Sequence, residues 1–356
     1  MHHLMKTAIA APLRDSMQPR TERKHLRRQI RVSSGSAIVL GLLEGKLDAA
    51  PTTAYLMTFV NGKCAANCGF CPQARGSHGK ADMLSRVSWP VFPIESVLNK
   101  LGEATEKNKI KRVCLQALNY PEVFADLQSL IRELKQWTSI PVSVSCQPMD
   151  IDNLRRLART GADRIGIPLD AATEELFDKI KGRSTGGPYV WKKQFELLRE
   201  AVAVFGEGKV STHFIVGLGE TEEEMIKVVQ QCVDMGVLPA LFAFTPIEGT
   251  ALRNMPQPPV QAYRRMQIAR SLIVSGLARA EKMRFDEKGR LADYGTGRQT
   301  LRRLIESGEP FRTSGCPNCN RPYYNEKPSG PIYNYPRKLE QEEIEEIRKQ
   351  ISPDGA

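Results

Sequence analysis

Three closely spaced cysteines are the residues of this chain with the clearest chemistry. They stand in the run Cys64-Ala-Ala-Asn-Cys68-Gly-Phe-Cys71. Three thiolates this close in sequence can ligate three irons of a cubane 4Fe–4S cluster and leave the fourth iron without a protein ligand. An open iron can bind a cofactor or substrate, as the open position of a catalytic metal does. The alternatives are a chance cluster of buried thiols and a zinc knuckle, although zinc sites favour two separated Cys-x-x-Cys pairs.

Four further cysteines are candidates for a second metal site. Cys316 and Cys319 form a Cys-x-x-Cys pair, a chelating spacing whose other two ligands are not nearby in sequence. Cys114 and Cys146 fall in predicted strands and either face the interior of the fold or act as small buried apolar residues. The predicted ligands of a second cluster are Cys316 and Cys319 with either Cys114 and Cys146 or the oxygen of Ser314.

Strand-like and helix-like segments alternate from residue 53 to about 275 and position these thiols. Apolar, β-rich runs predict six strands, at 54–60, 112–118, 140–146, 164–169, 210–216 and 239–245. Stretches with helical periodicity lie between them, among them 122–137, 190–205 and 221–235. Six βα units in series predict an α/β fold, a partial (β/α)6 barrel of TIM type with its helices outside. In such a barrel, reactive groups gather at the carboxyl ends of the strands.

A C-terminal extension departs from this pattern. Its predicted parts are a hairpin at 283–290, a basic helix at 297–306, an irregular loop at 310–336 and a charged helix at 339–351. We expect it to cover the barrel mouth and to bring Cys316 and Cys319 to the second cluster. The predicted domains are an N-terminal arm with a lead-in helix at 1–50, the barrel at 51–280 and the extension at 281–356.

Small and acidic residues at the ends of the predicted strands are candidate cofactor ligands. Gly217 and Gly219 lie between a strand and a helix, where glycine lets the backbone approach a ligand, and Thr221 can cap the helix that follows. Asp170 follows the fourth strand. Its carboxylate can bind ribose hydroxyls or, in the alternative, cap the helix that is predicted to start near Ala171.

Charge and cysteine usage limit the partners and the compartment. The net charge is +11, and residues 1–33 hold eight basic against two acidic residues. Such an arm either attracts an acidic partner or is a solvated leader; nucleic acid is disfavoured because no aromatic residue interleaves the basic ones. No apolar stretch approaches the roughly 20 residues that cross a membrane, and no secretory signal is evident. Eight cysteines then indicate a reducing environment, so we expect a cytoplasmic protein.

The three-cysteine run, including the aromatic Phe70 before its third cysteine, resembles the signature of the radical S-adenosylmethionine (radical SAM) enzymes. The resemblance implies that the open iron binds the methionine end of SAM and that one electron then yields a 5′-deoxyadenosyl radical. It also implies that the turn with Gly217 and Gly219 contacts the adenine. Gln116 falls, by position, at the turn that receives the methionine amino group, although the usual Gly-Gly-Glu is absent here.

Two further segments are similar to biotin synthase. The runs Arg112-Val-Cys114-Leu-Gln and Val144-Ser-Cys146-Gln-Pro resemble segments whose cysteines ligate a second, sacrificial iron–sulfur cluster in that enzyme. Biotin synthase supplies a further cysteine where this chain has Ser211. This departure argues against biotin synthase itself.

The C-terminal run Arg312-Thr-Ser-Gly-Cys316-Pro-Asn-Cys319-Asn-Arg-Pro-Tyr-Tyr-Asn-Glu resembles the biotin synthase-related subunit of the two-component lipoyl synthase of archaea and some bacteria. Its start also resembles the Arg-Ser-Ser-Tyr motif of lipoyl synthases, in which a serine ligates the auxiliary cluster; Ser314 is the matching residue. The resemblance implies sulfur insertion into an octanoyl chain, with Cys316, Cys319 and Ser314 as the reactive site and a second 4Fe–4S cluster as the sulfur source.

The same resemblance implies partners. These are a second radical SAM subunit, an octanoylated lipoyl-domain or glycine-cleavage H protein, and an electron donor such as ferredoxin or flavodoxin. Alternative functions are a biotin synthase-like enzyme or another two-cluster radical SAM enzyme, such as a methyltransferase or a cofactor maturase. An RNA methylthiotransferase is disfavoured because the sequence lacks an N-terminal cysteine-rich domain and a recognisable RNA-binding module. A non-enzymatic role as a scaffold or electron carrier would leave the open iron unused.

Overall fold

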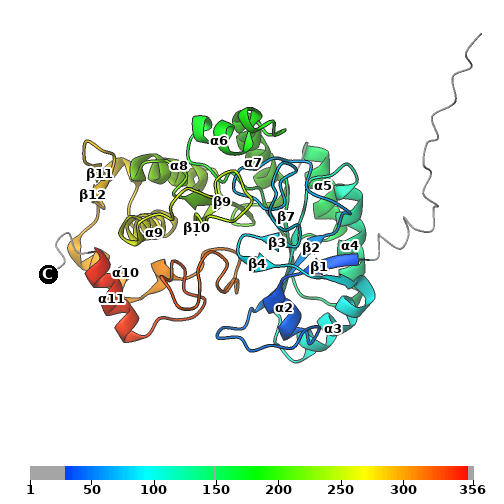
Figure 1. Ribbon diagram of the computed structural model, residues 1–356. Coiled ribbons are helices and arrows are strands. Elements are labelled where there is room, and N and C mark those ends of the chain that lie inside the picture. Colours follow the sequence, from blue (N-terminus) through cyan, green and yellow to red (C-terminus); the bar gives the residue numbers. More distant parts are fainter. Residues whose placement is uncertain (1–28, 148–149, 352–356) are drawn as a thin grey trace, which may run out of the picture.

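The computed structural model describes residues 29–147 and 150–351, and its centre is one eight-stranded sheet. In spatial order the strands are β10 (Val237–Ala243), β9 (Val210–Val216), β8 (Arg164–Gly166), β7 (Val142–Ser145), β6 (Arg112–Gln116), β2 (Thr53–Thr58), β1 (Gln29–Val32) and β5 (Val91–Pro93). The six strands from β10 to β2 pair in parallel, whereas β1 lies antiparallel to both β2 and β5. The predicted mixed α/β fold with a partial barrel is confirmed (Figure 1).

Burial along β9 shows how a strand presents two faces. Val210, Thr212 and Phe214 are fully buried, whereas Ser211 and His213 between them are only partly buried. Successive side chains of a strand point to opposite faces of the sheet. The fully buried residues therefore face the helices, and the alternate residues face the barrel interior, where polar groups can serve a site.

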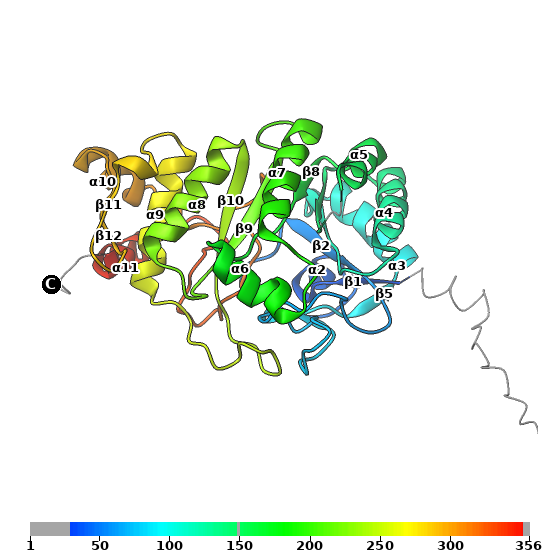
Figure 2. The same cartoon turned by 90° about the horizontal axis from the view of Figure 1, so that it is seen from above.

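Helices cover the outer face of the sheet (Figure 2). They are α3 (Ile94–Glu106), α4 (Val123–Trp137), α5 (Ile151–Thr160), α7 (Trp191–Phe205), α8 (Glu222–Asp234) and α9 (Val260–Val274). In α4 the buried residues Val123, Leu127, Ile131 and Leu134 recur at helical spacing, and each such side chain stabilises the fold by roughly 1.5–3 kcal/mol. The side chain of Thr221 accepts a bond from the backbone N–H three residues on in a capping box, so its predicted role as the α8 cap is confirmed.

The C-terminal extension contains the elements predicted for it. The hairpin comprises β11 (Arg284–Phe285) and β12 (Leu291–Asp293), with its second strand just beyond the predicted segment. It is followed by α10 (Arg298–Glu306) and, after a long irregular segment, by α11 (Gln341–Ile351). In Figure 1 the irregular loop of the extension, coloured orange to red, runs between α9 and the strands nearest the N-terminus, whereas β11 and β12 lie at the far left, beyond α9.

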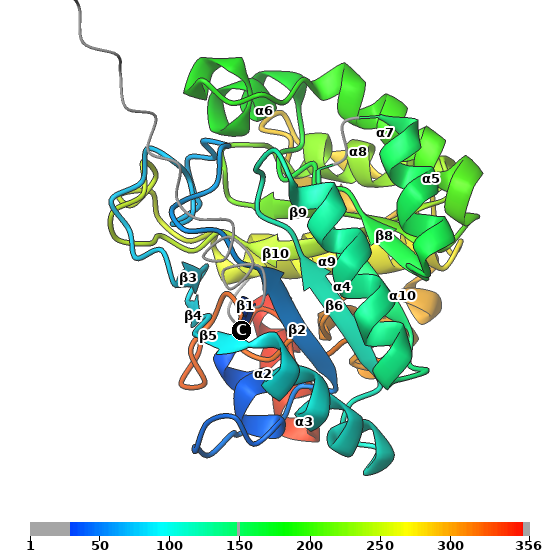
Figure 3. The same ribbon diagram turned by 90° about the vertical axis from the view of Figure 1, so that its right-hand side faces the viewer.

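Residues 312–336, here called the tail segment, bridge the open side of the barrel. On the side of β10, the Leu241 N–H donates to Ser314 Oγ at 3.1 Å. On the side of β2, Asn320 Nδ2 donates to the Ala50 carbonyl at 2.8 Å. Figure 3 shows this part of the chain beside β2. The tail segment therefore fills the gap that six strands leave in the barrel.

The tail segment also reaches the carboxyl ends of the strands. Thr245 Oγ1, two residues past β10, donates to the Asn325 carbonyl at 2.8 Å. Ser85, in the turn between β3 (Met83–Leu84) and β4 (Val87–Ser88), donates through Oγ to the Tyr324 carbonyl at 3.0 Å. The extension was predicted to cover the mouth, and Tyr324 and Asn325 of the tail segment do lie there. The segment also extends back to the starts of the strands.

The N-terminal region is described only in part. Residues 1–28, which hold most of the predicted basic arm, lie outside the described residues. Arg31 lies in β1, is buried, and donates to the Trp89 carbonyl at 3.1 Å, so it belongs to the sheet and not to a solvated arm. A short helix, α2 (Ser34–Val39), leads on toward β2. Within the described ranges no helix combines the length and apolar character of a membrane span.

Candidate active site

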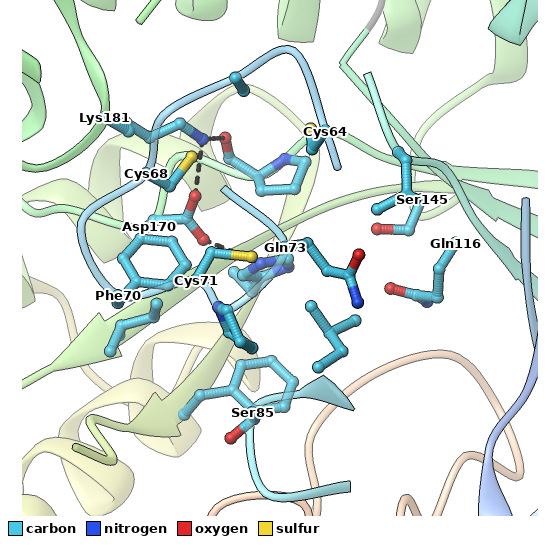
Figure 4. A pocket seen from close by; sticks show the side chains of 18 of the residues that line it. Cys64, Cys68, Phe70, Cys71, Gln73, Ser85, Gln116, Ser145, Asp170 and Lys181 are labelled. Atoms are coloured by element: carbon cyan, nitrogen blue, oxygen red, sulfur yellow. Dashed lines mark hydrogen bonds and ion pairs between the residues drawn. The ribbon is translucent and has the colours of Figure 1, made fainter. Parts of the chain in front are cut away.

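A pocket at the carboxyl ends of the parallel strands contains the three-cysteine loop. We call it the upper pocket; its empty space of about 1100 Å³ includes open solvent at its mouth. Cys64, Cys68 and Cys71 line it, together with Cys146 and residues at the ends of β6, β8, β9 and β10. Figure 4 shows the three cysteines of the loop around the same space as Gln116 and Asp170.

Backbone hydrogen bonds fix the shape of the cysteine loop. The Cys64 N–H donates to the Gln73 carbonyl at 2.9 Å, which closes the loop on itself, and the Cys71 N–H donates to the Cys68 carbonyl at 3.0 Å. The Lys63 ammonium donates to the Gly79 carbonyl at 2.8 Å. Because the loop is held at its base and within its turn, the three thiols are fixed relative to one another.

The thiols suit a cluster better than a single ion. Burial raises the pKa of the Cys68 thiol and raises that of Cys71 to about 12, so their thiolates need nearby positive charge. In the described ranges, no three or more His, Cys, Asp or Glu side chains converge to hold one metal ion. A cubane cluster does not require such convergence, because each thiolate binds a different iron. The donor set fits a 4Fe–4S cluster, and the role of these cysteines as its ligands remains a prediction.

A buried ion pair lies beside the loop. Asp170 has a left-handed backbone (φ +66°), and its Oδ2 lies 2.6 Å from Nζ of Lys181, the last residue of α6 (Glu174–Lys181). His213 Nε2 lies 2.9 Å from Asp170 Oδ1. Burial by itself would raise the pKa of Asp170, but Lys181 and His213 outweigh it and lower the pKa to about 2. Asp170 is therefore a carboxylate whose two oxygens both face positive or polar partners.

This arrangement bears on the two roles considered for Asp170. The capping alternative is wrong, because α6 begins at Glu174 and the side chain of Thr173 caps it. Binding of ribose hydroxyls stays a prediction. Sequence reasoning missed Lys181, because a lysine in the last turn of an amphipathic helix is usually solvated. It also missed His213, because nothing in the sequence marks this residue as a neighbour of Asp170.

The structure divides the predicted cofactor-binding residues into two groups. Phe70 and Gln116 line the upper pocket, as does Asp170. Among the described residues that line it, Gly217 and Gly219 are not found. Their φ angles are +100° and +120°, a backbone conformation that favours glycine. The shape of the turn therefore suffices to explain why glycine occupies both positions. Adenine contact by this turn stays a prediction.

Three of the cysteines predicted for a second site meet inside the barrel. Tyr55 Oη, in β2, lies 3.2 Å from Cys319 Sγ, and Ser143 Oγ, in β7, lies 3.4 Å from Cys316 Sγ. Burial, together with the proximity of Cys316 and Cys319, raises the pKa of Cys114 to about 12. We call Cys114, Cys316 and Cys319 the lower thiols. They lie beside the middle of the strands, below the carboxyl ends that form the upper pocket.

The other two predicted ligands of the second site lie elsewhere. Cys146 follows β7 and lines the upper pocket. The Ser314 hydroxyl accepts the Leu241 N–H of β10. Gln116 connects the two levels, because it lines the upper pocket while its Nε2 donates to Cys114 Sγ at 3.0 Å.

Two arginines, which sequence reasoning missed, accompany the lower thiols. The Arg321 guanidinium stacks over the Tyr324 ring, 3.9 Å from its centroid. Arg112 is buried and donates to Ser143 Oγ at 2.9 Å. No carboxylate of the described residues lies within 4.0 Å of either guanidinium. Arg112, which is buried, and Arg321, which is partly buried, place positive charge beside Cys114 and Cys319, whose pKa values are raised by burial. This charge indicates that an anionic group belongs here, and thiolates bound to an iron–sulfur cluster fit that requirement.

Comparison with protein families and curated proteins gives three results. Residues 59–232 match the model of the Radical SAM superfamily. A biotin synthase from Sulfurihydrogenibium sp. is 27% identical over 202 residues, which cover 55% of this chain and 56% of that protein. A lipoyl synthase from Haemophilus influenzae is 27% identical over 182 residues, covering 49% of this chain and 51% of that protein. The chain thus spans about half the length of the curated relatives it matches.

Comparison with solved structures returns a crystal structure of methylornithine synthase. It aligns with a TM-score of 0.49 at 15% sequence identity, covering 73% of this chain and 70% of that chain. The family match includes the cysteine loop and Asp170, and it ends before the tail segment with Cys316 and Cys319.

Proposed function

Because residues 59–232 are a domain of the radical SAM superfamily, in a chain related to biotin synthases and lipoyl synthases, we propose that the protein inserts sulfur into the octanoyl chain of a lipoyl carrier protein. The observation that carries this proposal is the second thiol set. Cys114, Cys316 and Cys319 gather inside the barrel, separate from the cysteine loop and accompanied by the buried Arg112 and the partly buried Arg321. A reaction that needs only SAM and one cluster gives no reason for them.

The family implies a 4Fe–4S cluster and SAM, and the upper pocket supplies residues to hold both. Cys64, Cys68 and Cys71 would ligate three irons, while Phe70 and Gln116 line the adjoining space. When bound, the cluster and SAM supply a carbon radical that can take hydrogen from an unactivated C–H bond, a reaction that acid–base side chains cannot perform.

The walls of the upper pocket suit an alkyl substrate. Met57, Leu118, Phe242, Phe244 and Ile247 give it apolar lining. Such a surface accommodates an alkyl chain and excludes water and stray hydrogen donors from a reactive carbon. The ion pair of Asp170 and Lys181 adds a polar end beside the cysteine loop.

The lower thiols would hold the second iron–sulfur cluster, which supplies sulfide for the new C–S bond. Arg112 and Arg321 would offset its negative charge, and the Tyr55 and Ser143 hydroxyls would orient the sulfur atoms by hydrogen bonds. The partners that follow from this function are a second radical SAM subunit, an octanoylated lipoyl-domain or glycine-cleavage H protein, and ferredoxin or flavodoxin as electron donor.

A double substitution, Cys316→Ala with Cys319→Ala, tests the function. We expect the variant to cleave SAM to 5′-deoxyadenosine but to stop incorporating sulfur into an octanoylated carrier, because only the lower site is damaged. Cys232→Ala is the matched control, since Cys232 is a buried thiol of the outer helix α8. Sulfur-containing product from the double variant would refute a sulfur source at the lower thiols. Methyl transfer by the wild type would favour the alternative classes.

A further inference from the structure

A second pocket opens at the other end of the barrel. Its empty space of about 910 Å³ includes open solvent, and Cys316 and Cys319 are among the residues that line it. Thr52 and Lys111, which immediately precede β2 and β6, also line it, so it lies at the amino ends of the parallel strands. None of its described lining residues is shared with the upper pocket. We call it the lower pocket.

The lower pocket carries excess positive charge. Of its three cationic residues, only Arg312 is paired, with Nη1 2.7 Å from Oε1 of Glu309. Arg270 donates through Nε to the Pro239 carbonyl at 2.6 Å, and Lys111 is exposed. Within the described residues, no carboxylate lies within 4.0 Å of Arg270 or Lys111. Small anions are therefore attracted to this pocket.

Hydrogen bonds on both sides fix the wall that holds the thiols. The Thr52 N–H donates to Asn320 Oδ1 at 3.0 Å, and the Thr52 hydroxyl donates to the Asn318 carbonyl. Thr313 Oγ1 donates to the Asn320 carbonyl at 2.8 Å. These bonds tie the Cys-x-x-Cys turn to the start of β2, so the lower pocket is a built feature of the fold.

We propose that the lower pocket is a separate entrance through which a small sulfur anion, such as hydrosulfide, reaches Cys316 and Cys319 without passing through the upper pocket. The inference rests on the proposed function, in which the sulfide consumed at the lower thiols must be replaced before the next turnover. A separate entrance lets this supply proceed from the end of the barrel opposite to the substrate.

Alkylation of the metal-free, reduced full-length chain tests the entrance. Each cysteine is reacted with anionic iodoacetate and with neutral iodoacetamide, and modification is followed residue by residue by peptide mass spectrometry. The ratio of the two rates cancels differences in thiol ionisation, because both reagents attack the thiolate. We expect the iodoacetate-to-iodoacetamide ratio to be severalfold higher at Cys316 and Cys319 than at Cys64.

Charge reversal at the mouth identifies the route. Lys111→Glu should lower the iodoacetate-to-iodoacetamide ratio at Cys316 and Cys319 by roughly threefold to tenfold. Lys111→Gln should lower it by less, and neither substitution should change the iodoacetamide rates. Lys109→Glu makes the same charge change at an exposed residue that does not line the pocket, and should have little effect. Equal ratios at all cysteines, or equal effects of the two charge reversals, would overturn the proposal. Because sulfur insertion does not enter this readout, failure of the proposed function would leave the ratios unchanged.

Discussion

Among single residues, Asp170 and Lys181 form the ion pair with the largest expected effect on stability. Their side chains are only 3% and 1% exposed. Removing one partner leaves the other charge buried and unpaired, so Lys181→Met or Asp170→Asn should each cost about 3–5 kcal/mol of unfolding free energy. The double variant should cost clearly less than the sum. Urea unfolding of the metal-free wild type, the two single variants and the double variant measures these costs. Strictly additive effects of the two substitutions would contradict the pairing.

Single residues also mark where the sequence is informative. The spacing of Cys316 and Cys319 predicts a chelating pair, and Cys114 joins them because it points into the barrel opposite Ser143. Cys146 does not, since it lies three residues further along, at the carboxyl end of the strand. Arg321 was not foreseeable, because its burial depends on contacts with Tyr55 and Tyr324, whose spatial proximity to one another the sequence does not reveal.

Among elements, the tail segment is anchored by a buried carboxylate. Glu326 accepts the Asn325 N–H and the Asn334 N–H, both at 2.9 Å. Burial nevertheless raises its pKa to about 7, above the value of about 4.3 expected in the unfolded chain. The unfolded state therefore releases its proton first as the pH rises, and Glu326 lowers stability progressively between about pH 4.3 and pH 7.

Glu326→Gln should remove this pH dependence. The unfolding free energy of the variant minus that of the wild type should rise by about 1–3 kcal/mol from pH 5 to pH 8. Urea unfolding of both proteins at the two pH values measures this difference. Glu345→Gln, at an exposed position of α11, is the matched control and should leave the difference unchanged. A parallel pH profile for Glu326→Gln and wild type would mean that this carboxylate ionises alike in both states.

The elements themselves were predicted unevenly. The six parallel strands follow from apolar runs of six or seven residues between helical stretches, and β9 occupies its predicted range. Strands β1 and β5 were missed because each is short and acquires strand character only by pairing with a distant partner. The path of the tail segment depends on hydrogen bonds to β2 and β10, so its composition predicted a loop but not its place along the barrel.

In the molecule as a whole, the six-stranded barrel holds two sets of thiols at different levels along its strands. The upper pocket lies at the carboxyl ends of the strands, as barrel enzymes generally require, and the tail segment brings the second set inside from the open flank. With a pocket opening at each end, this arrangement suits the proposed function, in which the radical source lies above and the sulfur source below.

Iron and acid-labile sulfide per chain, after anaerobic reconstitution, test the existence of two clusters most directly. Three proteins are compared: the wild type, the triple variant Cys64→Ala/Cys68→Ala/Cys71→Ala, and the triple variant Cys114→Ala/Cys316→Ala/Cys319→Ala. Two cubane clusters predict about eight irons in the wild type and about four in each variant. About four irons in the wild type, undiminished when the lower thiols are removed, would contradict a second cluster and with it the proposed sulfur insertion.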